Sequence, residues 1–187
     1  MRPPGGFTED EWAAARPWNE YLDSVEDKRD VWLANAKRAK IDEEAAARLG
    51  NLPGRRRVLV LTEDWCGDAA RSVPTIALAL ERTPLVEHRY LDSDEHGAVV
   101  ERYLTHGGRG IPLAIVQDES GAELGTWGPR PAPLQALFRA RRRELGTPDA
   151  EEMAAFYAPV MAWYGKDRGK TVLAELLMLL ERGGDPR

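Results

Sequence analysis

The chain has 187 residues, of which 43% are hydrophobic and 30% charged, and its formal net charge is −5 at pH 7. This length allows one sizeable hydrophobic core, and the composition is typical of ordinary soluble globular proteins. The negative charge argues against a nucleic acid or an anionic membrane surface as the main partner, and no apolar run approaches the roughly 20 residues that span a bilayer. We therefore expect one domain over residues 1–187, with neither nucleic acid nor membrane as a partner.

The cysteine content indicates the redox compartment. Cys66 is the single cysteine of the chain. It cannot form an internal disulfide, which fits a reducing environment. Residues 1–10 contain no apolar core and no cleavage site of the kind found in signal peptides. We expect a cytoplasmic protein.

Residues 8–50 form the first segment, which we expect to be a helical extension. Thr8 and Glu11 have the spacing of a capping box, and Pro17 separates the first helix from the next. Aromatic side chains then recur at helical spacing, and Asp42 is a suitable cap for a short further helix. Tryptophan at helical spacing usually belongs to a core or its edge, so this extension is expected to pack on the domain.

The sequence pattern changes at about residue 55, where a core of about 55–144 begins. Residues 58–61 form a short continuous apolar run, which is typical of a strand buried on both faces. A helical pattern that contains Pro74 follows it. The remaining expected elements of the core are a strand at 85–91, a polar helix at 94–104, strands at 113–117 and 122–127, and a helix at 131–144.

Two C-terminal helices are expected within residues 148–182. Thr147 and Pro148 precede an amphipathic helix, and a last helix covers about 170–181. The first of them carries an apolar stripe on one face, formed by Met153, Phe156, Tyr157, Val160, Met161 and Tyr164. We expect both helices to pack on the domain, with a partner-binding face as the alternative.

The junction between the first strand and the following helix resembles a known active site. Residues 65–69 read Trp-Cys-Gly-Asp-Ala, which resembles the active-site turn of thioredoxins. The pair Ile111-Pro112, just before the strand at 113–117, looks like the cis-proline of the same fold. The order of elements over 55–144 is also similar to that of thioredoxin. The resemblance, to a bacterial branch of single-cysteine thioredoxin-like proteins, implies an α/β thioredoxin fold: a central mixed sheet flanked by helices, with extra helices at both ends.

The physical chemistry of this turn is consistent with a reactive thiol. Only the thiolate is nucleophilic, and the N-terminus of a helix stabilises the anion. Gly67 leaves room for another chain to approach the sulfur, Trp65 offers a flat apolar wall, and a cis Ile111-Pro112 bond would leave the Ile111 backbone free to pair with a substrate. We expect Cys66 to be catalytic and the substrate to be bound by Trp65, Gly67, Asp68, Ile111 and Pro112.

This sequence departs from thioredoxin at two positions. Ala69 stands where the second cysteine of the Cys-x-x-Cys motif would be, so an internal thiolate cannot resolve a mixed disulfide. Val60 stands where thioredoxins carry a buried acid that helps to deprotonate the second cysteine. Both departures exclude the dithiol cycle and favour a monothiol mechanism.

Asp68 has two possible roles. Its charge opposes formation of the Cys66 thiolate, but an acid is also favourable in the first turn of a helix, and we expect this second role to be the main one. We expect the helix N-terminus to prevail and the pKa of the thiol to lie below its ordinary value. His88, His96 and His106 lack the spacing of metal ligands and are expected at the surface, so we expect no metal and no cofactor.

Two classes of function remain. The first is an enzyme, a monothiol thiol–disulfide oxidoreductase whose partners are protein thiols or mixed disulfides and a small thiol. The alternative is a non-catalytic thioredoxin-fold module that binds a peptide or partner protein, with Cys66 as a sensor or a relic. Iron–sulfur binding by a glutaredoxin-like dimer is a weaker third hypothesis. The oligomeric state does not follow from the sequence.

Overall fold

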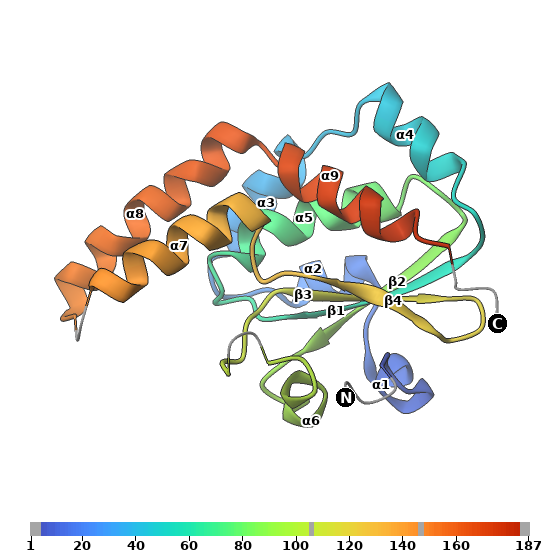
Figure 1. The fold of residues 1–187 in the computed structure, drawn as a ribbon, viewed down its shortest axis with the longest axis horizontal. Helices are drawn as coiled ribbons and strands as arrows, with labels where there is room; N and C mark the ends of the chain where they lie inside the picture. Colours follow the sequence, from blue (N-terminus) through green and yellow to red (C-terminus); the bar gives the residue numbers. More distant parts are fainter. Residues whose placement is uncertain (1–4, 105–106, 146–147, 184–187) are drawn as a thin grey trace.

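The centre of the molecule is a mixed β-sheet with helices on both faces (Figure 1). The computed structural model describes residues 5–104, 107–145 and 148–183. The four strands are β1 (Arg56–Thr62), β2 (Val86–Asp92), β3 (Leu113–Asp118) and β4 (Glu123–Trp127), in the spatial order β2-β1-β3-β4. β1 and β2 are parallel, whereas β3 is antiparallel to both β1 and β4. This is the mixed sheet that the resemblance implied.

The helices follow the expected order, with one clear difference in length. The cap of α1 at Thr8 and the cap of α4 at Asp42 are confirmed. The polar helix expected at 94–104 is reduced to five residues, since the main-chain N–H of Asp94 donates to the Glu63 carboxylate and belongs to a turn. None of the helices in the described ranges is both long and apolar enough for a membrane crossing. The bounds are α1 (Glu9–Ala14), α2 (Trp18–Ser24), α3 (Arg29–Arg38), α4 (Glu43–Gly50), α5 (Ala69–Leu80), α6 (Gly97–Glu101), α7 (Ala132–Glu144), α8 (Ala150–Asp167) and α9 (Lys170–Leu180).

Strand β1 is buried on both faces, as its apolar run predicts. Val58 and Val60 belong to a cluster with side chains of α3, α5 and α9, whereas Leu59 and Leu61 belong to a second cluster with side chains of α1 and α6. The two sets alternate because successive side chains of a strand point to opposite faces. In Figure 1, α5 and α9 lie on one side of the sheet and α1 and α6 on the other. The turn that carries Cys66 therefore extends from a strand with core packing on both sides.

The N-terminal helices are fixed to the sheet by aromatic packing. The rings of Trp18, Tyr21 and Trp32 pack on one another, and Trp18 and Tyr21 also lie 5.1 and 5.7 Å from the Tyr90 ring of β2. The backbone of Arg16 exchanges two hydrogen bonds with that of Tyr90, which pairs part of the outer edge of β2. The core role expected for these aromatic residues is confirmed.

The last helix, α9, is joined to the sheet and its connections by polar contacts at its C-terminal end and at its middle. The buried Arg56 guanidinium of β1 donates to the carbonyls of Leu180 and Arg182, at 2.9 and 3.0 Å, and so satisfies carbonyls at the C-terminal end of α9. At the middle of the helix, Glu175 accepts from the Trp127 indole and from the Ala132 main-chain N–H, each at 2.8 Å. These bonds fix the connection between β4 and α7.

Helices α7 and α8 form an antiparallel hairpin that extends away from the rest of the molecule (Figure 1). Phe156, Val160 and Tyr164 of the expected stripe are buried, and they lie against α7, where they meet Leu134 and Phe138. These three residues of the stripe therefore pack on the domain as expected, and the element that covers them is α7, the last helix of the expected core. The expected start at Thr147 lies outside the described residues.

Candidate functional site

The turn that carries Cys66 connects β1 to α5. The Cys66 carbonyl accepts from the Ala70 N–H at 3.0 Å, and its sulfur accepts from the Ala69 N–H at 3.5 Å. Cys66 therefore precedes α5 and is not inside its first turn, but the sulfur is directed to the free N–H groups at the start of the helix. Such N–H groups favour an anion.

The sulfur lies against the segment that precedes β3. The Cys66 thiol donates to the Ile111 carbonyl, with 3.6 Å between sulfur and oxygen, and the Ile111–Pro112 peptide bond is cis. Only 7% of the residue is exposed. The two parts that the sequence analysis placed in one site are thus adjacent, and the sulfur lies in a nearly closed junction between them.

Burial raises the pKa of the Cys66 thiol above its ordinary value, and the negative charge of Asp68 adds to the rise. Three groups lower the pKa, namely the main-chain N–H groups of Ala69 and Asp68 and the positive charge of Arg130. Each of these effects is smaller than that of burial, and the pKa remains raised. The expectation of a lowered pKa is therefore wrong. The reason is that the sequence pattern indicates the helix N-terminus but does not reveal how completely the sulfur is removed from water.

Asp68 is not the exposed first-turn charge that the sequence suggested. It is 4% exposed, it makes no side-chain capping bond, and its carboxylate is ion-paired with Arg130 at 2.5 Å. The hydroxyl of Tyr164 donates to the same carboxylate at 2.9 Å. A buried carboxylate needs such partners, and here they come from the connection before α7 and from α8.

The path of the chain after β4 brings Arg130 to Asp68. Gly128 has a φ of 126°, and a Cβ at this position would overlap the Pro112 carbonyl oxygen. Glycine therefore lets the chain pass directly against the Pro112 backbone. Arg130 follows, and its guanidinium carbon stacks 3.7 Å from the centre of the Phe138 ring. One connection thus contacts both sides of the site.

Trp65 and Gly67 flank the cysteine in different surroundings. Trp65 is 46% exposed, and its indole N–H donates to the Asp94 carboxylate at 3.3 Å, so it forms an accessible apolar surface at the rim of the site. Gly67 is half-buried, and a Cβ there would lie 3.5 Å from the sulfur of Met161. This is an ordinary contact distance, so the neighbour of Gly67 is α8 of the same chain, and a side chain at this position would not be excluded by it.

The acids that precede Cys66 are engaged elsewhere. Glu63 accepts from the Ser93 hydroxyl and the Asp94 N–H, and Asp64 accepts from two main-chain N–H groups, those of Glu26 and Asp27. Val60 is fully buried in the same apolar cluster as Cys66. Glu63 and Asp68 are both buried, but only Asp68 follows the cysteine.

The histidines lie apart from the site. His88 is half-buried on β2 and 2.9 Å from the Tyr90 hydroxyl, which corrects its expected surface position; burial lowers its pKa to about 4. His96 contacts the Asp92 carbonyl, and His106 falls outside the described residues. Within those residues, no group of three or more His, Cys, Asp or Glu side chains is arranged to hold a metal ion.

Comparisons with known proteins agree with this architecture. The thioredoxin family model Thioredoxin_9 matches residues 15–145, and the chain belongs to this family. A crystal structure of a protein of unknown function from Pseudomonas aeruginosa is similar, with a TM-score of 0.72 and 16% identity over 95% of this chain and 98% of the other. An HIV epitope-scaffold has a TM-score of 0.71 and 15% identity, with 94% and 98% covered. Comparison with curated protein sequences gives no match.

Three residues of the site did not emerge as site residues from the sequence. Arg130 lies between two prolines in a connection that carries no motif, and Tyr164 and Met161 belong to a stripe that was interpreted as packing. All three approach residues 67–68 from the α7–α8 region. The sequence offers no signal that Arg130, just before α7, and Tyr164, inside α8, share Asp68 as a partner, which only the three-dimensional structure shows.

Proposed function

We propose that this member of the thioredoxin family catalyses thiol–disulfide exchange by a monothiol mechanism through Cys66. The observation that supports it best is the position of the sulfur, which accepts from the Ala69 N–H at the start of α5 and lies 3.6 Å from the Ile111 carbonyl. A substrate disulfide would reach the sulfur at this junction once the hydrogen bond from the Cys66 thiol to the Ile111 carbonyl is broken. Trp65, Gly67, Asp68, Ile111 and Pro112 would surround the bound substrate.

The reaction needs a mixed disulfide between a protein and a small thiol. The Cys66 thiolate attacks the sulfur of the small thiol, a new disulfide forms between them, and the protein thiolate leaves and takes up a proton. A second small thiol, as its thiolate, then attacks the small-thiol sulfur bound to Cys66. This step forms the oxidised small-thiol dimer and releases the Cys66 thiolate, so each turnover consumes one free small thiol as the reductant. A reducing cytoplasm would provide it.

Mass spectrometry of the intact protein tests this proposal. The chain is incubated with the disulfides of several small thiols, and the adducts are weighed before and after addition of the free thiol. We expect one adduct on Cys66 that the free thiol removes, and no adduct on the Cys66→Ser variant. Absence of any adduct over a range of pH and thiol type would contradict the proposed activity.

The burial of the thiol favours a second candidate. A raised pKa and 7% exposure slow thiolate attack, whereas the exposed Trp65 offers a surface that a peptide could contact without chemistry. In this alternative the chain is a non-catalytic thioredoxin-fold module that binds a peptide or partner protein. It predicts that Cys66→Ser retains partner binding in full, whereas the enzyme loses all turnover.

A further inference from the structure

The α7–α8 region contributes directly to the surroundings of Cys66, although α8 lies beyond the residues that the family model matches. Tyr164 and Met161 of α8 approach Asp68 and Gly67, and Arg130 approaches Asp68 from the start of α7. Residues 67 and 68 follow the cysteine immediately in the turn. The hairpin is therefore joined to the site and is more than an appendage.

The pair formed by Asp68 and Arg130 is almost completely buried. The exposed fractions of the two side chains are 5% and 11%. Charges removed from water interact strongly with their neighbours, because little solvent screens them. The sulfur of Cys66, two residues from Asp68, is one of these neighbours.

We propose that Arg130 and Tyr164 are positioning residues for Cys66, which act by holding and neutralising the Asp68 carboxylate and so set the reactivity of the adjacent sulfur. For its biological meaning this inference rests on the proposed function, in which that sulfur is the nucleophile. In this proposal, residues of the α7–α8 region control the reactivity of the Cys66 thiol. Without Arg130, an unpaired negative charge would remain beside the sulfur.

The groups around the sulfur from each neighbouring element are known. Asp68 lies on its own turn, Arg130 on the connection between β4 and α7, and Tyr164 on α8. Arg71 of α5 donates to the Gly67 carbonyl at 2.9 Å, and from the β3 side the neighbour is the uncharged Ile111 carbonyl. Asp68 disfavours the thiolate and Arg130 favours it. Loss of the Asp68 charge should therefore increase the reactivity of the sulfur, and loss of the Arg130 charge should decrease it.

The test is the rate of alkylation of Cys66 by iodoacetamide, an uncharged reagent, at a fixed pH of 7.5. We expect Asp68→Asn to react about three- to tenfold faster, and Arg130→Gln about three- to tenfold slower, than the unsubstituted protein. The double variant, which has neither charge, should return to within about twofold of the starting rate. Tyr164→Phe keeps the ring but removes one donor to Asp68, and it should react about twofold more slowly.

The direction of each change in alkylation rate distinguishes an electrostatic effect on the thiol from a general opening of the structure. If the substitutions only open the structure, both single variants will expose the sulfur and both will react faster, which would overturn the proposal, as would unchanged rates in both. Arg130→Lys keeps the charge and should stay close to the unsubstituted protein. Should Arg130→Gln not fold, the comparison of Asp68→Asn with the double variant decides, because loss of Arg130 must still slow the reaction.

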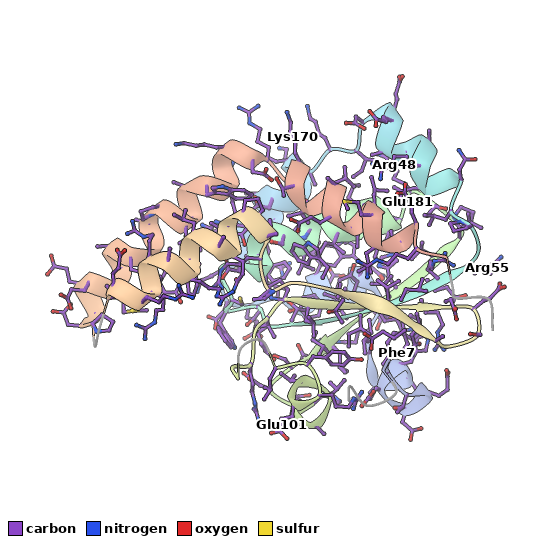
Figure 2. The ribbon with its side chains drawn as sticks, in the orientation of Figure 1. Phe7, Arg48, Arg55, Glu101, Lys170 and Glu181 are labelled. Carbon is purple, nitrogen blue, oxygen red and sulfur yellow. The ribbon has the colours of Figure 1, made fainter. Side chains whose placement is uncertain are left out.

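A matched control is available at the far side of the molecule. Arg48 of α4 forms a two-fold hydrogen-bonded ion pair with Glu181, which follows α9, and Figure 2 shows both side chains well away from the hairpin. Arg48→Gln should leave the alkylation rate unchanged. Because iodoacetamide reacts with any accessible thiol, this experiment can succeed or fail independently of the small-thiol adduct that tests the proposed function.

Discussion

The indole N–H of Trp32 donates a hydrogen bond to the main-chain carbonyl of Asp64, with 2.9 Å between nitrogen and oxygen. Trp32 is fully buried in α3, and Asp64 lies two residues before Cys66. The N-terminal extension is therefore connected directly to the turn that carries Cys66. Asp64 strengthens the connection, since its carboxylate accepts from the N–H groups of Glu26 and Asp27, just before α3.

Replacement of Trp32 by phenylalanine tests this connection. Trp32→Phe removes the donor and leaves the Asp64 carbonyl without this partner, so we expect the free energy of unfolding to fall by about 1–3 kcal/mol beyond the loss of packing. Urea denaturation measures it. Trp12→Phe is the matched control, since Trp12 is also buried but belongs to the other apolar cluster. Equal losses in the two variants would contradict a special role for the hydrogen bond.

The pH dependence of Cys66 alkylation follows from the direction of its pKa. Because burial raises the pKa of the folded thiol, the midpoint of its pH–rate curve should lie above about 8.5, where an ordinary thiol is half ionised. The same protein in urea should show the ordinary midpoint. A folded midpoint below that of the unfolded chain would show that the helix N-terminus outweighs burial after all.

His88 should make stability depend on pH. Its pKa is lowered to about 4 in the folded protein, whereas an unfolded histidine titrates near 6.5. Below about 6.5 the unfolded chain binds a proton that the folded chain does not, so stability decreases as the pH falls toward 4, by at most about 1.4 kcal/mol per pH unit. Denaturation curves at several pH values should show this slope, and His88→Phe should reduce it. An unchanged slope in the variant would assign it to other groups.

Restoration of the missing cysteine tests the geometry of the turn. The Ala69 N–H lies 3.5 Å from the Cys66 sulfur, and residues three apart at the start of a helix suit the Cα spacing of about 4.4–6.8 Å that disulfides require. Ala69→Cys should therefore lose two hydrogens in mass on treatment with a mild thiol oxidant. We expect only weak dithiol reductase activity, because Val60 provides no proton acceptor for the new thiol. A mass that stays unchanged would contradict this geometry.

Patterns of local sequence were sufficient for most of the fold. The apolar run around Val58 correctly predicted a doubly buried strand, since both faces of β1 are covered by other elements. The caps at Thr8 and Asp42 could be predicted because each depends only on residues three apart. The polar helix around Val99 was predicted too long, since a contact from Glu63 fixes the preceding turn. The apolar stripe of α8 was predicted from its helical spacing. The sequence of that helix alone does not show whether α7 or the sheet covers the stripe.

The site was less predictable than the fold. Cys66 and Ile111 were correctly predicted to lie in one site because the resemblance to thioredoxin indicated that these distant parts of the chain are adjacent. It could not reveal the burial of Asp68, whose partners Arg130 and Tyr164 lie 62 and 96 residues further along the chain (130 − 68 and 164 − 68). It also could not reveal the burial of Cys66 itself, which is the main cause of the raised thiol pKa. Ionisation is thus the property that local patterns predict least well here.

Arg56 has a consequence for how the chain is made. This residue begins the first strand of the sheet, yet the carbonyl of Leu180 to which it donates is 124 residues further along the chain. During synthesis the first strand leaves the ribosome long before α9 exists, so its guanidinium must remain hydrated until almost the whole described chain has been translated. Completion of the core therefore coincides with arrival of the last helix.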